Sequence, residues 1–367
     1  MRSPPVSARL PDFPWDRLAD ARATATAHRG GVVDLSIGTP VDPTPVAVRA
    51  ALCAAADSPG YPATIGTPAL REALVRWLGR TCGAAAGGVE HVLPVIGSKE
   101  LIASLAVHLG LGAGDTVVVP TLAYPTYEVG AALAGCQVAF GDPVDGDLTV
   151  DRPSLVWVNS PSNPTGRVLD VDHLRALVAW ARDRGALVVS DECYLHCAWE
   201  ALPVSVLDPA VCAGSYDGLL AVHSLSKRSN LAGYRCAFVA GDAAVIAELL
   251  AVRKNLGLQM PGPQQRAMVA ALDDDADAAA QHAVYARRRG LLRSALERTG
   301  LRVEHSQGSL YLWATRGEPC WDTVDRLADH GILVAPGDFY GRAGARHVRV
   351  SFTATDERID AAVQRLG

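Results

Sequence analysis

The sequence predicts an α/β protein that has a mainly parallel sheet between helices and a smaller α+β domain. Short, wholly apolar segments alternate with amphipathic segments from about residue 45 to 242, a pattern typical of parallel strands covered on both faces. After residue 242 the chain changes to long Ala/Leu/Arg helices and two β-rich pieces. A length of 367 residues also allows two domains. We therefore expect an N-terminal arm and part of the small domain at 1–42, a large domain at 43–242 and a small C-terminal domain at 243–367.

The first forty residues form a polar lead that contains four prolines and then an Ala/Arg helix that reaches about His28. Gly30 and Gly31 end that helix, and the segment 32–37 leads into a turn at Gly38-Thr39-Pro40. In the large domain, amphipathic segments predict helices at 45–56, 68–80, 98–109, 126–133 and 171–184. Short apolar or β-branched runs predict strands at 92–96, 116–119, 155–158, 186–190, 219–223 and 236–240.

The predicted small domain begins with long helices that continue to about residue 299. Strands at 310–314 and 347–352 and helices at 321–329 and 356–366 follow them. The acidic run at 273–275, together with Asp277, is better explained as a helix N-terminal cap than as a metal site.

Composition excludes several classes of protein. The formal charge is −5, from 34 Lys+Arg and 39 Asp+Glu, whereas a nucleic-acid-binding protein should show a basic face. No apolar run approaches the roughly 18–20 residues of a membrane span, and residues 1–14 lack the apolar core of a secretory signal. We expect a soluble, cytoplasmic protein without a nucleic-acid or membrane partner.

The eight cysteines include no C-x-x-C pair, and most of them lie in apolar stretches. Disulfide frameworks belong to small secreted domains and zinc sites need clustered ligands, so free buried thiols are the better interpretation. The neighbours His196 and Cys197 come nearest to a metal pair, and we predict no metal site.

Polar residues gather where predicted strands end, which in an open α/β sheet is the edge that binds ligands. Gly97-Ser98-Lys99-Glu100 follows a strand and opens a helix, an arrangement that suits a phosphate. Asn163 lies in a rigid loop with two prolines and a glycine. Asp191 ends an apolar strand, where a buried carboxylate needs a cationic partner. Lys227 lies between hydroxyls just after another strand, a position in which a lysine can form a Schiff base.

Four of these motifs in register resemble the fold-type I, class I/II aminotransferases, which use pyridoxal 5′-phosphate (PLP). The motifs are Asn163-Pro164-Thr165-Gly166, Asp191 to Tyr194, Ser224-x-Ser226-Lys227 and Arg235. The resemblance extends from Gly38 to Arg349. It implies a PLP-dependent transferase of this fold and a homodimer whose substrates are amino acids and 2-oxo acids.

The resemblance also implies roles for single residues. Lys227 would hold PLP as an internal aldimine and move the proton between Cα and C4′. Asp191 would pair with the pyridine nitrogen, so that the ring can accept electrons. Asn163 and Tyr194 would hydrogen-bond the phenolic oxygen of the ring, and Tyr124 would stack on its face.

The remaining implied contacts concern the phosphate, the substrate and the partner subunit. Ser98, Lys99 through its backbone N–H, Ser224 and Arg235 would form the phosphate cup. Arg349 would clamp the substrate carboxylate, with Asn163 beside it and Gly38 leaving room for it, while Arg346 is a rival for this role. Tyr61 would reach the active site of the neighbouring subunit. From the residues alone, Tyr61 and Tyr124 also suit core positions.

Finer resemblance points to the actinobacterial N-succinyldiaminopimelate aminotransferases, in stretches that include 11–16, 96–101, 310–313 and 331–341. It implies transfer from glutamate to N-succinyl-2-amino-6-oxopimelate, in lysine and diaminopimelate biosynthesis. Lys99, Arg228 and Arg17 are candidates for binding the anionic distal end. Residues 255–264, near the expected substrate channel, depart from that pattern, so recruitment to another amino acid stays open.

Two further functions compete with transamination. A PLP β-lyase would use the same cofactor site. A regulatory protein with a PLP fold and a helix-turn-helix domain would need more than the 37 residues that precede Gly38.

Overall fold

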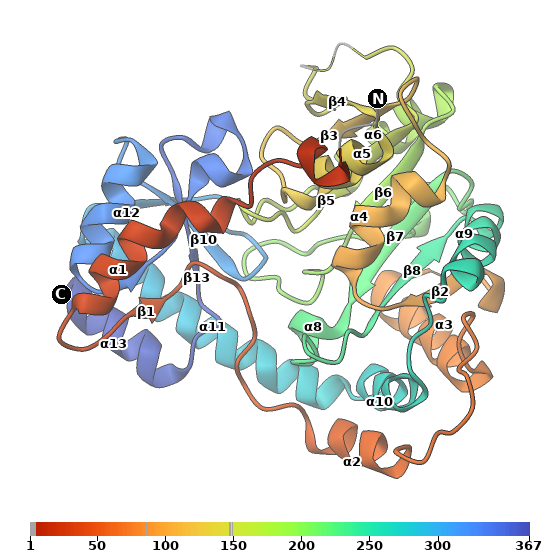
Figure 1. Ribbon diagram of the computed structural model, residues 1–367, viewed down its shortest axis with the longest axis horizontal. Coiled ribbons are helices and arrows are strands. Elements are labelled where there is room, and N and C mark those ends of the chain that lie inside the picture. Colours follow the sequence, from red (N-terminus) through yellow and green to blue (C-terminus); the bar gives the residue numbers. More distant parts are fainter. Residues whose placement is uncertain (1–4, 85–86, 147, 149) are drawn as a thin grey trace.

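A seven-stranded sheet forms the centre of the larger part of the molecule, in the order β2-β8-β7-β6-β5-β3-β4 (Figure 1). The computed structural model describes residues 5–84, 87–146, 148 and 150–367, so residues 1–4 of the predicted N-terminal arm lie outside the described residues. The strands are β2 (Val92–Val95), β3 (Thr116–Val119), β4 (Gln137–Phe140), β5 (Leu155–Asn159), β6 (Leu187–Asp191), β7 (Leu219–Ser224) and β8 (Ala237–Gly241). All neighbours pair in parallel except β8, which runs antiparallel to β2 and β7. The mainly parallel sheet predicted from the sequence is confirmed.

Helices cover both faces of this sheet because its strands are apolar on both sides. In β5, Leu155 and Trp157 pack with α4, α5 and α9, whereas Val156 and Val158 pack with α3, α6 and α10. The helices of this part are α2 (Val46–Ala54), α3 (Pro68–Cys82), α4 (Ser98–His108), α5 (Thr126–Ala134), α6 (Val171–Asp183), α7 (Pro209–Cys212), α8 (Leu225–Arg228), α9 (Ala243–Leu256) and α10 (Gly262–Leu272).

The smaller part joins the N-terminal segment to the C-terminal tail. Its four-stranded antiparallel sheet has the order β12-β13-β10-β9, and β1 pairs in parallel with β11. Leu18 and Ala21, near the N-terminus, share one hydrophobic cluster with Leu312 and Ile359 of the tail. The elements are α1 (Ala19–Ala27), β1 (Val33–Asp34), α11 (Asp275–Arg298), β9 (Arg302–Glu304), β10 (Tyr311–Thr315), α12 (Cys320–Asp329), β11 (Ile332–Leu333), β12 (Ala335–Pro336), β13 (Val348–Ser351) and α13 (Asp356–Leu366). Short 3₁₀ helices lie at Val6–Arg9, Pro14–Leu18, Val89–His91, Gly337–Tyr340 and Arg342–Gly344.

Helices α9 and α10 pack on the large sheet although they follow residue 242. Ile246 and Leu249 of α9 belong to the cluster on one face, and Met268 and Leu272 of α10 belong to the cluster on the other. The domain boundaries predicted at residues 42 and 242 stay predictions. We propose that the second boundary lies after α10, because α11 is the first later helix that packs in the small cluster.

Most predicted elements form within one or two residues of their expected ends. The edge strand β4 was not predicted; its end residues Gln137 and Phe140 are exposed and the two residues between them are half-buried. The acidic run caps α11 as expected: the Asp274 carboxylate accepts a hydrogen bond from the Asp277 backbone N–H at 2.9 Å.

The cysteines of the chain are free thiols, and five of the eight are buried. Among the described residues, no helix combines the length and the apolar character that crossing a membrane requires.

Candidate active site

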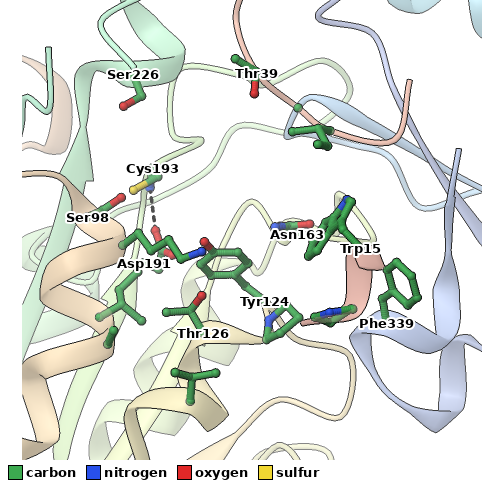
Figure 2. A pocket seen from close by; sticks show the side chains of 18 of the residues that line it. Trp15, Thr39, Ser98, Tyr124, Thr126, Asn163, Asp191, Cys193, Ser226 and Phe339 are labelled. Atoms are coloured by element: carbon green, nitrogen blue, oxygen red, sulfur yellow. Dashed lines mark hydrogen bonds between the residues drawn. The ribbon is translucent and has the colours of Figure 1, made fainter. Parts of the chain in front are cut away.

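A cavity of about 700 Å³ lies at the carboxyl edge of the large sheet and extends to the small sheet and the N-terminal segment. It is lined by most of the site residues predicted from the sequence, some of which Figure 2 shows around Tyr124. Those residues are Gly38, Ser98, Lys99, Tyr124, Asn163, Asp191, Tyr194, Ser224, Lys227, Arg235 and Arg349. They come from segments more than 300 residues apart, so the fold brings the separate motifs together.

Asp191, the last residue of β6, is a buried carboxylate with well-defined hydrogen bonds. Its Oδ2 accepts a hydrogen bond from the Tyr127 hydroxyl at 2.8 Å, and its Oδ1 accepts one from the Cys193 backbone N–H at 3.2 Å (Figure 2). Burial raises the pKa of Asp191, and hydrogen bonds from Cys193 and Tyr127 and the charge of Lys227 partly offset this rise. A cation placed against this carboxylate would therefore be strongly favoured.

Lys227 projects from the short helix α8 into the same cavity. Its Nζ donates a hydrogen bond to the Gly38 carbonyl oxygen at 2.5 Å. Gly38 lies 189 residues earlier in the chain, in the segment that crosses from the small part to the large part. The Lys227 amine is therefore held at the junction of the two parts. Among the described residues that line the cavity, Lys227 and Lys99 are the two lysines.

Hydroxyl and guanidinium groups form a cradle suited to a phosphate. Ser98 is the first residue of α4, and the hydroxyls of Ser224 and Ser226 share a hydrogen bond of 2.9 Å. Arg235 packs so closely that a Cβ at Gly97 would lie 2.0 Å from its Nη2, and Gly97 has a φ of +98°. Only glycine fits this position, which lets the backbone at the start of α4 approach the guanidinium.

Arg349 of β13 is only 3% exposed, and its guanidinium is fixed on several sides. Nη1 donates to Asn163 Oδ1 at 2.9 Å, and Nη2 donates to the Ser36 carbonyl oxygen at 2.7 Å. The guanidinium carbon lies 3.9 Å from the ring centre of Tyr311 and 4.9 Å from that of Tyr340. The sequence analysis left Arg346 as a rival for carboxylate binding, but Arg346 is exposed and does not line the cavity.

Tyr194 and Tyr311 join the two halves of the site. Their hydroxyls share a hydrogen bond of 2.9 Å. Burial acts to raise the pKa of Tyr311, but Arg349 and Lys227 outweigh it, so the pKa is lowered. A Cβ at Gly38 would lie 2.3 Å from the Tyr311 hydroxyl oxygen, so Gly38 leaves the space that Tyr311 occupies.

The two remaining aromatic predictions differ in outcome. Tyr124 lines the cavity, and its ring meets that of Tyr127 edge-on, with the centroids 5.8 Å apart. Tyr61 does not line the cavity, and it is 99% exposed, so it is not a core residue.

The candidate anchors for a distal anionic group are mostly engaged elsewhere. Arg228 is buried, and it donates to the Ala271 carbonyl oxygen and the Asp275 carboxylate. Arg17 pairs with Asp338 at 3.0 Å. Only Lys99 lines the cavity, and none of residues 255–264 does so.

The sequence analysis missed Tyr127 and Tyr311, and it named Ser226 only within its motif. Tyr127 lies inside a predicted helix, and Tyr311 lies among the apolar residues of a predicted strand, so the sequence pattern at both positions is typical of core aromatic residues. Their hydroxyl contacts depend on packing between distant elements. The position of Ser226, next to Lys227, was the one available signal.

Comparisons with known proteins agree with this geometry. A family model described as aminotransferase class I and II matches residues 30–366. The chain is 62% identical to a probable aminotransferase of Mycobacterium tuberculosis, over 98% of this chain and 86% of that protein. It is 59% identical to the 4-dedimethylamino-4-oxo-anhydrotetracycline transaminase OxyQ of Streptomyces rimosus, over 97% of this chain and 99% of that protein.

More distant relatives share the whole fold. The chain is 33% identical to the LL-diaminopimelate aminotransferase of Dehalococcoides mccartyi, over 97% of this chain and 96% of that protein. A crystal structure of an aminotransferase from Neisseria meningitidis superposes with a TM-score of 0.89, at 30% identity, and covers 98% of this chain and 97% of that one.

Proposed function

Because the chain belongs to the class I and II aminotransferases, a PLP-dependent family, we propose that it transfers an amino group between glutamate and a 2-oxo acid in the cavity around Lys227. The observation that carries this proposal is the convergence of Lys227, Asp191 and Arg349 on one cavity. These three residues supply an amine, a buried acid and a carboxylate-binding cation.

The residues present fit PLP. The buried Asp191 carboxylate would pair with the protonated pyridine nitrogen, which supplies the cation that its environment favours. Ser98, Ser224 and Arg235 would bind the phosphate, together with the Lys99 backbone N–H at the start of α4. When bound, PLP carries the amino group and accepts the negative charge that develops at the substrate Cα.

The ring would be positioned by three further residues. Tyr124 would stack on one face, and Asn163 and Tyr194 would donate hydrogen bonds to the phenolic oxygen. The Tyr194 hydroxyl already shares a hydrogen bond with Tyr311, which orients it, and the Asn163 carbonyl oxygen accepts from Arg349. Each donor group is therefore held by a contact on its other side.

Lys227 would hold the cofactor covalently and move a proton at the substrate Cα. In the structure the Nζ donates a hydrogen bond to the Gly38 carbonyl oxygen, 2.5 Å away. Arg349 would bind the substrate α-carboxylate through the N–H groups that Asn163 and Ser36 leave available. These two contacts would fix the Cα between the amine and the cation.

The amino acceptor is a narrower part of the proposal. Resemblance to N-succinyldiaminopimelate aminotransferases and identity to LL-diaminopimelate aminotransferases support a diaminopimelate-type acceptor, N-succinyl-2-amino-6-oxopimelate, and a place in lysine biosynthesis. The greater identity to OxyQ supports the alternative of an enzyme recruited to another substrate. Among the described residues that line the cavity, Lys99 is the one cation without another proposed role for its side chain, so it alone could bind a distal carboxylate. This shortage of cations favours an enzyme recruited to another substrate.

We also propose a homodimer in which Tyr61 reaches the active site of the partner subunit. The nearly complete exposure of this tyrosine, between Gly60 and Pro62, supports a contact outside its own chain. Cytoplasmic location stays a prediction.

The test is the visible spectrum of the purified holoenzyme during titration with glutamate. Wild type should lose the absorbance of the Lys227-bound cofactor as the amino group is transferred, and added 2-oxo acid should restore it. Lys227→Ala should show no such conversion. Lys254→Ala, which changes an exposed lysine outside the cavity, should behave as wild type. Release of pyruvate and ammonia from a cysteine-like donor would instead identify a β-lyase, and an absence of any spectral response would refute both.

A further inference from the structure

The outer half of the cavity is walled by apolar side chains from four separate segments. Phe13 and Trp15 belong to the N-terminal segment, Ile102 to α4 and Val129 to α5, and Phe339 belongs to the 3₁₀ helix Gly337–Tyr340. Ring centroids are 5.6 Å apart for both Phe13–Trp15 and Trp15–Phe339, so the three rings form a continuous strip. In Figure 2, Trp15 and Phe339 lie on the opposite side of Tyr124 from Ser98 and Asp191. We call this surface the aromatic wall: Phe13, Trp15, Ile102, Val129 and Phe339.

Charges around the aromatic wall disfavour an anionic substrate tail. Among the described lining residues, three of the four Lys and Arg side chains (Lys227, Arg235 and Arg349) serve the cofactor and the α-carboxylate under the proposed function. The fourth, Lys99, has its Nζ 5.9 Å from the Phe13 ring centre, and the carboxylates of Asp12 and Glu128 also line the cavity. Among the lining residues that have no other assigned role, a distal dicarboxylate would therefore meet one cation and two acidic residues. Arg17, whose guanidinium carbon lies 5.4 Å from the Phe339 ring centre, is paired with Asp338.

The wall also contains apolar surface that the chain itself does not cover. Within the wall, Phe13 is 56% exposed, whereas Ile102 and Phe339 are buried; Ile37 and Leu10, which also line the cavity, are 47% and 36% exposed. Exposed apolar side chains that line a concave site mark a surface that a ligand can cover. Flat rings stack well on aromatic side chains, so a planar substituent would gain most from this strip.

We propose that the aromatic wall binds an aromatic or similarly flat apolar substituent on the substrate, so that the amino acid that exchanges its amino group with the glutamate pair is an aromatic one. This inference rests on the proposed function, because it places the α-carboxylate on Arg349 and the reacting Cα beside Lys227. The substituent then extends past Tyr124 toward Phe13 and Trp15. The wall sets substrate choice and takes no part in the chemistry.

Single-turnover kinetics of the holoenzyme test this assignment. The conversion of the bound cofactor is followed with L-phenylalanine, L-tryptophan, L-glutamate, LL-diaminopimelate, N-succinyl-LL-diaminopimelate and L-alanine, one donor at a time. We expect the second-order rate constant of the best aromatic donor to exceed those of both diaminopimelate donors by at least about tenfold, the scale on which an apolar pocket discriminates.

Two matched variants locate the effect. Phe13→Ala should slow the aromatic donors by about tenfold and leave L-alanine within about twofold, because that donor does not reach the wall. Phe140→Ala removes another phenylalanine of similar exposure, 51%, that does not line the cavity, and all donors should react as with wild type. Because Phe13 is more than half exposed, its replacement should leave the fold intact.

The outcomes separate the two proposals. Conversion by a diaminopimelate donor at least as fast as by every aromatic donor overturns the aromatic wall and leaves the proposed transaminase standing. Equal slowing of L-alanine and the aromatic donors in Phe13→Ala also overturns it, since the wall would then not act on the substituent. A holoenzyme that no donor converts refutes the proposed function and the wall together.

Discussion

Replacing Gly38 by alanine tests whether one contact sets the geometry between the two parts of the site. The new Cβ would lie 2.3 Å from the Tyr311 hydroxyl oxygen and 2.6 Å from its Cε1, closer than non-bonded atoms approach. Gly38 has no positive φ, so backbone strain does not contribute. The ring of Tyr311 is buried and must move. Its displacement would disturb its hydrogen bond to Tyr194 and its stacking on Arg349.

The size of the effect follows from these two contacts. A net hydrogen bond is worth about 0.5–1.5 kcal/mol, and a cation–π contact is worth about 0.5–2 kcal/mol. Loss of both would remove about 1–3.5 kcal/mol of transition-state stabilisation, which corresponds to a fall of about 5- to 400-fold in kcat/KM. Because Arg349 is proposed to bind the substrate carboxylate, much of the loss should appear in KM.

The assay is steady-state transamination with glutamate, together with thermal unfolding to check the fold. Gly114→Ala is a suitable control, because a Cβ there meets no atom within 4 Å and its φ is not positive. In a Tyr311→Ala background, Gly38→Ala should have little further effect, since the clashing ring is gone. Wild-type kcat/KM in Gly38→Ala, or full additivity of the two substitutions, would refute the reasoning.

Three further predictions concern binding and stability. Arg349→Lys should raise KM for amino donors by about tenfold or more, because a lysine makes no bidentate contact; unchanged steady-state kinetics would contradict this. Glu100→Ala should lower the free energy of unfolding by about 3–5 kcal/mol, measured in urea, because it leaves the fully buried Arg253 without its partner at 2.8 and 2.9 Å; a loss below about 1 kcal/mol would refute it. Burial raises the pKa of Glu192 from 4.5 to about 7, so the folded state keeps a proton that the unfolded chain loses, and stability falls as pH rises from 4.5 to 7. Glutamine does not titrate, so the unfolding constant of Glu192→Gln should not share this pH dependence. The ratio of the variant's unfolding constant to that of wild type should therefore fall by up to about tenfold per pH unit between pH 4.5 and 7, and a ratio that stays constant would contradict the shift.

The fold was largely predictable because its information is local. Six of the seven strands of the large sheet are short apolar runs, and they form at the expected residues. Strand β4 was not predicted from the sequence. It lies at the edge of the sheet with Gln137 and Phe140 exposed, so it does not have to be apolar on both faces. The packing of α9 and α10 on the large sheet was also not predicted, because the pattern of an amphipathic helix does not indicate which surface the helix covers.

The site was predictable where a residue type is costly at its position. A carboxylate at the end of the apolar strand β6 and a lysine just after β7 have few structural explanations, so Asp191 and Lys227 could be selected as candidates, and both line the cavity. Tyr127 and Tyr311 could not, because an aromatic residue in an apolar segment needs no special explanation. Arg228 shows the opposite error: a basic residue beside the motif lysine was a plausible anchor, yet it turns away to bind Ala271 and Asp275.

The position of Arg349 explains how two separately packed parts can form one site. Its guanidinium plane lies against the rings of Tyr311 and Tyr340, which belong to the small part, while one edge binds Asn163 of the large part. A guanidinium has five N–H donors, and the two known bonds leave three for a carboxylate. Because the cation is oriented before substrate arrives, binding a carboxylate costs little ordering of the side chain. Under the proposed function, the contact with Asn163 would couple that carboxylate to the cofactor side of the cavity, so any shift between the two parts would change substrate binding and ring positioning together.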